Sequence, residues 1–161
     1  MCGIIAAAST RNVGKLLVQG LHRMEYRGYD SAGIALHQLD GVAHLRTLGK
    51  VQLLEDRMIE EKPRSKLGIA HTRWATHGEP SETNAHPHKS NDEVFIVHNG
   101  IIENHLELKA ELEKEGYSFA SQTDSEIIAH LLDFNLKQGM TMIEAMFASI
   151  MVIPCFKLKS S

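Results

Sequence analysis

The sequence has few cysteines, no excess of basic residues and no long apolar run. Its two cysteines, Cys2 and Cys155, cannot build the framework of a disulfide-rich secreted fold, so a reducing cytoplasm is the expected location. The 17 Lys and Arg residues are outnumbered by 20 Asp and Glu residues, which leaves no basic surplus for nucleic acid or an anionic membrane. No stretch approaches the roughly 18 apolar residues of a membrane span, and the N-terminus lacks a signal-peptide pattern.

The residues that are present are typical of one globular domain. The 161 residues are 43% hydrophobic and 23% charged, which excludes wholesale disorder and leaves no room for two ordinary domains. Short continuous apolar runs predict a strand over 2–9 that is buried on both faces, another buried strand over 66–74 and a third strand over 93–98. Apolar segments on either side of Asp40-Gly41 predict a hairpin, because this dipeptide favours a type I′ turn.

Helices are predicted between and after these strands. Apolar residues at steps of three and four predict an amphipathic helix over 12–24. A short helix is expected to end before Pro63, and 103–115 has a helical composition. Two Thr-x-x-Glu capping boxes, Thr123 to Glu126 and Thr141 to Glu144, predict the starts of two more helices.

The remaining segments are less regular. Residues 117–122 are strand-like, and residues 75–92 form a long polar loop, of a length that is usually functional in a compact domain. Strands come early, with helices between and after them. The sequence therefore predicts an α+β fold in which helices cover sheets.

Cys2 is the first candidate for chemistry. Because its side chain is small, the initiator Met1 is removable, and the Cys2 thiol is then joined to a free α-amino group. Such an amine has an unperturbed pKa of about 7.7–8.0 and can act as the general base for its own side chain. Nucleophiles activated by an N-terminal amine are an established arrangement. The alternative is that Cys2 is a small buried hydrophobic residue.

Three further positions have both a functional and a structural interpretation. Asn99-Gly100 can be a tight turn, or an oxyanion hole built from a side-chain amide and a backbone N–H. Arg73 can clamp a substrate carboxylate through two hydrogen bonds, or pair with a surface carboxylate. Asp124 can bind a substrate ammonium group, or complement a helix dipole.

Two weaker interpretations concern the polar loop and the histidines. Trp74, Thr76 and His77 can belong to a lid or to an ordinary loop. The ten histidines suggest a metal site, but the sequence has no HExxH motif and no regular ligand spacing. No metal is therefore expected, and interior histidines are expected to hydrogen-bond at polar strand ends.

Five segments, in this order and spacing, resemble the N-terminal glutaminase domain of the glucosamine-6-phosphate synthase family, a branch of the class II glutamine amidotransferases. They are Cys2-Gly3-Ile4, YRGYDSAG at 26–33, GIAHTRWATHGEPSETNAHPH at 68–88, VHNGIIENH at 97–105 and SQTDSEIIAHLL at 121–132. The resemblance covers 2–149 and implies the four-layer αββα sandwich of the N-terminal-nucleophile hydrolases, incomplete at the C-terminus. Residues 150–161 diverge from the family pattern, and its sugar-isomerase domains are absent from the sequence.

The resemblance implies catalytic roles at four matching positions. Cys2 is the expected nucleophile that attacks the side-chain amide of glutamine. Asn99 and Gly100 are expected to form the oxyanion hole, and Arg27 is expected to support the region around Cys2.

It also implies how glutamine binds. Arg73 is expected to hold the α-carboxylate of glutamine and Asp124 its α-ammonium group. Trp74, Thr76 and His77 are expected to belong to the loop that closes over the substrate.

The resemblance implies no metal and no organic cofactor. L-glutamine is the implied partner, together with fructose 6-phosphate in a complete enzyme, which is expected to be a homo-oligomer. Neither nucleic acid nor a membrane is expected. The segments YRGYDSAG, HTRWATHG and NAHPH favour the amino-sugar branch. The alternatives are another class II enzyme, such as a glutamine phosphoribosylpyrophosphate amidotransferase, and a truncated remnant without catalysis.

Overall fold

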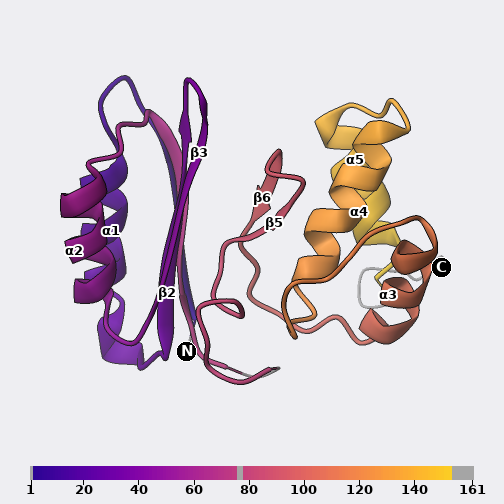
Figure 1. The fold of residues 1–161 in the computed structure, drawn as a ribbon, viewed down its shortest axis with the longest axis horizontal. Coiled ribbons are helices and arrows are strands. Elements are labelled where there is room, and N and C mark those ends of the chain that lie inside the picture. The colour runs from indigo at the N-terminus through magenta and orange to yellow at the C-terminus, as the bar shows by residue number, and fades with distance from the viewer. Residues whose placement is uncertain (1, 76–77, 154–161) are drawn as a thin grey trace, which may run out of the picture.

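The computed structural model describes residues 2–75 and 78–153. Four layers follow one another across the molecule, in the order helices, sheet, hairpin and helices (Figure 1). Helices α1 (Gly14–His22) and α2 (Val51–Glu61) form the first layer, while α4 (Glu126–Lys137) and α5 (Met142–Met151) lie in the last. This is the predicted αββα order, and the α+β class is confirmed.

The larger sheet has the order β1-β4-β2-β3, and all of its neighbours are antiparallel. Its strands are β1 (Gly3–Ala8), β2 (Ser31–Gln38), β3 (Gly41–Leu48) and β4 (Leu67–Arg73). The predicted strands and the hairpin at Asp40-Gly41 are therefore confirmed. The prediction that the first strand is buried on both faces is wrong, because β1 lies at the sheet edge and Ile4 is 41% exposed.

The main core lies between this sheet and the first helical layer. Leu17 and Leu21 of α1 and Leu54 of α2 are fully buried against Ile34 and Leu36 of β2. Complete burial of each such side chain stabilises the fold by about 1.5–3 kcal/mol. The helices are held on the sheet by this contact, as the amphipathic pattern predicts.

The second sheet is a short hairpin within the described residues. Strand β5 (His88–Ser90) pairs with β6 (Val94–Ile96) around Asn91 and Asp92, which both have a positive φ. Asn and Asp tolerate this left-handed conformation better than other non-glycine residues. The polar loop predicted over 75–92 is thus partly wrong, because residues 88–90 form β5 and residues 91–92 lie in the hairpin turn.

The helical layer beside the hairpin follows the sequence pattern with one correction. Helix α3 (His105–Lys114) ends before Gly116, which has a φ of 89°, as predicted for a C′ glycine. Helix α5 begins with the predicted capping box: the Thr141 side chain accepts from the Glu144 N–H, and the Glu144 carboxylate accepts from the Thr141 N–H. This reciprocal pair satisfies two backbone donors that a helix start leaves unpaired.

The capping box predicted at Thr123 and Glu126 is wrong, as is the strand over 117–122. Helix α4 begins at Glu126 itself, whose carboxylate accepts from the N–H groups of Ala120 and Ser121, at 2.9 and 2.7 Å. These N–H groups are the donors that a strand would use for pairing. Thr123 instead shares a hydrogen bond of 2.8 Å with Nε2 of His88.

Gly33 is expected to tolerate no side chain. A Cβ atom there would lie 2.1 Å from the carbonyl oxygen of His86 and 2.9 Å from that of Leu45. Because both neighbours are backbone atoms, Gly33→Ala should lower the free energy of unfolding by at least about 1–3 kcal/mol. Gly14→Ala is the control, since its methyl group would meet the flexible end of Met58. Urea denaturation of both variants tests this, and an equal small effect would contradict it.

Candidate active site

The C-terminal end of β4 is the point around which the candidate site is built. His71 and Arg73 are two residues apart on this strand, so their side chains point to the same face of the sheet. Cys2 directly precedes Gly3, which pairs with Thr72 across the β1–β4 ladder. The antiparallel register therefore brings Cys2 to the end of β4.

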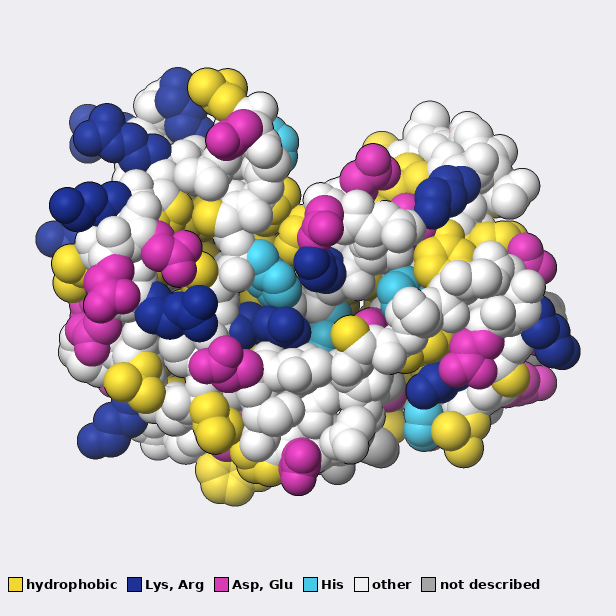
Figure 2. All heavy atoms as spheres, in the orientation of Figure 1, with side chains coloured by type: hydrophobic (Ala, Val, Ile, Leu, Met, Phe, Trp, Pro, Cys, Tyr) yellow, Lys and Arg dark blue, Asp and Glu magenta, His cyan; other side chains and the backbone are white. Residues whose placement is uncertain are grey.

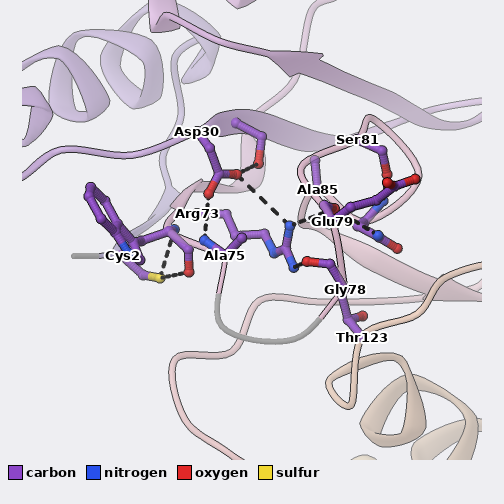
Figure 3. Close-up of polar contacts among 12 residues, drawn as sticks. Cys2, Asp30, Arg73, Ala75, Gly78, Glu79, Ser81, Ala85 and Thr123 are labelled. Carbon is purple, nitrogen blue, oxygen red and sulfur yellow. Dashed lines mark hydrogen bonds and ion pairs between the residues drawn. The ribbon is translucent and has the colours of Figure 1, made fainter.

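The thiol of Cys2 contacts the backbone just after β4. The N–H of Trp74 lies 3.1 Å from Sγ of Cys2, and the thiol lies 3.6 Å from the Trp74 carbonyl oxygen, to which it can donate (Figure 3). Cys2 is half-buried and free of disulfide bonding. A partly accessible thiol is what a nucleophile requires. Cys155 lies outside the described residues.

Arg73 is a buried cation, with 4% of its surface exposed. In Figure 3 its guanidinium lies between Asp30 and the backbone of Gly78 and Glu79. Nη1 is 3.9 Å from Oδ1 of Asp30, and the guanidinium donates to the carbonyl oxygens of Gly78 at 3.3 Å and Glu79 at 3.5 Å. A buried charge requires such partners, because its hydration is lost. The sequence alternative of a surface ion pair is wrong for Arg73.

The Asn99-Gly100 dipeptide lies where the chain leaves β6. Gly100 lies in a bend after β6 and the chain then continues to α3, so the dipeptide lies at a turn after the strand that does not close a hairpin. Oδ1 of Asn99 lies 2.7 Å from Nε2 of His71. A Cβ atom on Gly100 would lie 2.6 Å from Nε2 of His98, so a side chain at this position would require the His98 ring to move.

Asp124 makes hydrogen bonds to the segment that follows Asn99 and Gly100. Its Oδ2 accepts from the N–H of Ile102 at 2.7 Å, and Ser125 donates to its Oδ1 at 3.4 Å. Oγ of Ser125 is also 3.0 Å from Nδ1 of His98. Asp124 itself is 5% exposed and lies ahead of α4. The carboxylate therefore fixes the backbone that carries Asn99.

The other predicted positions lie around this group or outside the described residues. Trp74 is 53% exposed, and its ring rests on Gly28, where a Cβ atom would lie 2.7 Å from the ring. Gly28 follows the short 3₁₀ helix η1 (Glu25–Arg27) and has a φ of 72°. The side chain of Arg27 lies outside the described part of the structure, as do both residues 76–77, which are Thr76 and His77.

Three buried histidines form a cluster next to Arg73, in which His71 stacks on His86 and His88 meets His86 edge-on. The rings of His71 and His86 are 4.2 Å apart at 25°, and those of His86 and His88 are 4.4 Å apart. Burial lowers the pKa of His71 to about 4 and that of His88 to about 3, and it holds the pKa of His86 far below its usual range. These rings are therefore neutral near pH 7. Figure 2 shows histidine side chains in the hollow where the two halves of the molecule meet.

No cluster of three or more His, Cys, Asp or Glu side chains in the described ranges is arranged to hold a metal ion. The histidines of this cluster instead make hydrogen bonds, His71 with Asn99 and His88 with Thr123. Hydrogen bonds at polar strand ends are what the sequence predicts for interior histidines.

Two residues of this constellation, Asp30 and His71, are not among the site residues predicted from sequence. Asp30 accepts from the N–H of Ala75 and pairs with Arg73. Its signal was its place in the YRGYDSAG segment, directly before Ser31, which pairs with Arg73 in the sheet. His71 carries the weaker signal of sharing a strand face with Arg73.

The comparison with known families assigns the class. Residues 71–154, more than half of the chain, match the family described as "Glutamine amidotransferase domain". The chain belongs to this family.

The curated relatives are more specific. The glutamine–fructose-6-phosphate aminotransferase (isomerizing) of Escherichia coli strain K12 is 55% identical over 151 residues, which are 93% of this chain and 25% of that protein. The enzyme of the same name from Vibrio parahaemolyticus is 55% identical over 146 residues, which are 90% of this chain and 24% of that protein. The chain thus spans about a quarter of the length of the curated relatives that it matches.

Solved structures confirm the fold. A glutamine phosphoribosylpyrophosphate amidotransferase from B. subtilis, complexed with ADP and GMP, superposes with a TM-score of 0.77 at 23% identity. It covers 95% of this chain, which corresponds to 33% of that chain. The structure described as the allosteric regulatory enzyme of purine biosynthesis gives a TM-score of 0.79 at 24% identity, with the same coverage. The fold is therefore that of the N-terminal-nucleophile amidotransferases.

Proposed function

We propose that this chain is a glutaminase domain that hydrolyses the side-chain amide of L-glutamine, with Cys2 as the nucleophile. The observation that carries the proposal is the meeting of a half-buried thiol, a buried guanidinium and an Asn-Gly dipeptide at one end of β4. The glutaminase domain spans 2–149, and 150–161 is a divergent tail. Catalysis requires neither a metal nor an organic cofactor.

The first step uses the α-amino group that removal of Met1 exposes. This amine takes the proton of the Cys2 thiol, and the sulfur attacks the amide carbon of glutamine. The side-chain N–H of Asn99 and the N–H of Gly100 stabilise the resulting oxyanion. Such donors are each worth about 2.7–4 kcal/mol in acyl transfer. The carbon–nitrogen bond then breaks, and ammonia leaves with the proton returned by the amine.

The second step releases glutamate. Water attacks the γ-glutamyl thioester, its proton passes to the α-amino group, and the carbon–sulfur bond breaks. The sulfur recovers a proton, so the thiol and the free amine are regenerated. Arg27 supports the region around Cys2 during both steps.

Substrate binding uses the two charges that flank the site. Arg73 binds the α-carboxylate of glutamine, since a guanidinium matches a carboxylate through two parallel hydrogen bonds. Asp124 binds the α-ammonium group. Trp74, Thr76 and His77 close over the substrate and exclude water.

In the complete enzyme the ammonia converts fructose 6-phosphate to glucosamine 6-phosphate, so that L-glutamine and D-fructose 6-phosphate give L-glutamate and D-glucosamine 6-phosphate. The names of the curated relatives support this acceptor, at 55% identity against 23% for the phosphoribosylpyrophosphate amidotransferase structure. Fructose 6-phosphate is expected to stimulate glutamine hydrolysis by the complete enzyme, and phosphoribosylpyrophosphate is not. The opposite pattern would favour the nucleotide branch.

The cellular setting follows from the same proposal. The complete enzyme is a cytoplasmic homo-oligomer that acts on small molecules and uses neither nucleic acid nor a membrane. Among the described helices, none is long and apolar enough to span a membrane.

Covalent labelling tests the nucleophile directly. The diazoketone analogue of L-glutamine is expected to label Cys2 alone. The diazo carbon takes up the proton that the thiol gives up, and the thiolate then displaces dinitrogen from this carbon and forms a carbon–sulfur bond. Intact-mass and peptide mass spectrometry measure the adduct and show whether Met1 has been removed. Arg73→Gln should slow labelling at least about tenfold at low reagent concentration, since a charged pairing is lost. A folded sample with a free N-terminal Cys2 and no adduct would favour the remnant without catalysis.

A further inference from the structure

His71 joins Asn99 to the central sheet. Nε2 of His71 lies 2.7 Å from Oδ1 of Asn99, and the imidazole is 1% exposed, whereas Asn99 is exposed. A side-chain amide oxygen only accepts hydrogen bonds, so Nε2 of His71 carries the proton and donates it. This hydrogen bond uses the amide oxygen of Asn99. The amide NH2 group, with its two N–H bonds, is the part of Asn99 that can donate to a ligand.

The charge state of His71 agrees with this geometry. Burial lowers its pKa to about 4, which the hydrogen bond to Asn99 and a weaker one to the backbone of His98 oppose only in part. A neutral imidazole has a single N–H, and here the acceptor on Asn99 places it on Nε2. Nδ1 of His71 is buried and makes no hydrogen bond to the described residues. A bare acceptor is more easily left unpaired than a buried N–H donor.

The imidazole is also held in place from several sides. Its ring stacks on that of His86, which is 4% exposed. On the backbone, His71 pairs with Ile4 of β1 on one side and Gly33 of β2 on the other. The Nε2–H bond is therefore presented from a rigid element to a residue on a loop.

We propose that His71 is a positioning residue for glutamine hydrolysis. Through its Nε2–H it fixes the Asn99 amide so that the amide N–H, and not the oxygen, faces the carbonyl oxygen of bound glutamine. This inference rests on the proposed function, because it takes Asn99 to be an oxyanion donor. A donor held in advance needs no reorganisation when charge develops, whereas a reversed amide would place an oxygen against the oxyanion.

Two substitutions separate this role from a purely structural one. His71→Leu keeps the bulk of the side chain and removes the donor, while His71→Gln keeps an N–H at a similar reach. We expect kcat for glutamine hydrolysis to fall about 10- to 100-fold in His71→Leu, with KM changed less than about twofold. His71→Gln should recover most of the loss. If both variants lose kcat in step with their thermal stability, the role is structural only and the inference is wrong.

A double-mutant cycle shows whether His71 acts through Asn99. Asn99→Ala alone is expected to lower kcat by about 10²-fold or more. In that background His71→Leu should cause almost no further loss, because the group that it positions is gone. Additive losses would overturn the inference while leaving Asn99 as a donor. An Asn99→Ala variant with unchanged kcat would instead sink the oxyanion-hole part of the proposed function.

A third measurement does not depend on turnover. The side-chain amide signals of Asn99 in a proton–nitrogen NMR spectrum are identified by their loss in Asn99→Ala. They are expected to shift in His71→Leu and to stay in place in His88→Gln, a control in the same histidine group. Unchanged Asn99 signals in His71→Leu would show that the hydrogen bond does not hold the amide, whatever the activity of the chain.

Discussion

Replacing Cys2 with alanine is expected to lower glutamine hydrolysis by at least about 10⁴-fold, the scale seen when a nucleophile is removed. Sγ of Cys2 is the atom that forms the thioester, and a methyl group cannot replace it. Cys155→Ala is the matched control and should leave the rate unchanged. Glutamate release in a coupled enzyme assay measures both variants.

The same experiment can show that the assignment is mistaken. Equal losses in Cys2→Ala and Cys155→Ala would mean that Cys2 is not the nucleophile. Circular dichroism of each variant is expected to show that the fold is kept, since Cys2 precedes β1 and its thiol contacts the backbone of Trp74. Blocking the α-amino group by retention of Met1 should have the same effect as removing the thiol.

Mild acid is expected to unfold this protein through its buried histidines. The pKa of His71 is lowered to about 4 and that of His88 to about 3, against an ordinary value of 6.5. The unfolded chain therefore binds protons that the folded chain cannot, and stability is complete above about pH 6.5 and falls as the pH drops toward 4. Near pH 4.5 the lowered pKa of each ring reduces the free energy of unfolding by about 2.5 kcal/mol, so the two rings together reduce it by about 5 kcal/mol.

That loss is comparable with the whole stability of a typical domain, about 5–15 kcal/mol. Urea denaturation at several pH values between about 7 and 4.5 measures it. His88→Gln should reduce the acid loss by about 2.5 kcal/mol. His22→Gln is the control, because hydrogen bonds to Glu25 and Glu55 raise the pKa of His22 despite its partial burial. His22 therefore stabilises the fold at low pH and loses this effect as the pH rises, which is the opposite of His88. A stability that is flat down to about pH 4.5 would contradict the prediction.

The periodic parts of the fold were predictable from sequence, and the tertiary parts were not. Apolar runs and the Asp40-Gly41 turn predicted the strands of the larger sheet, because burial dictates their pattern. The three-residue strand β5 is too short and polar to give such a signal. The capping box at Thr123 and Glu126 failed because Glu126 binds the N–H groups of residues 120 and 121 instead.

The candidate site divides in the same way. Cys2, Asn99 and Arg73 have side chains whose chemistry suggests a role at once, and the fold brings all three to β4. Asp30 and His71 carry weaker signals, which are a place in the YRGYDSAG segment for Asp30 and a shared strand face with Arg73 for His71. The role of Asp30 depends on the register of β4 with β2, and that of His71 on the path of the chain after β6, which brings Asn99 next to His71. Only the folded molecule shows these two features.

One strand sets the spacing of the whole site, since His71, Arg73 and Trp74 contact Asn99, Asp30 and Cys2 in turn. Deleting one residue between positions 71 and 73 would turn neighbouring side chains to opposite faces of the sheet and separate all of these contacts at once. The insertion or deletion of a single residue within β4 would therefore separate the residues of the candidate site, whereas a change of length in the surrounding loops would leave this spacing intact.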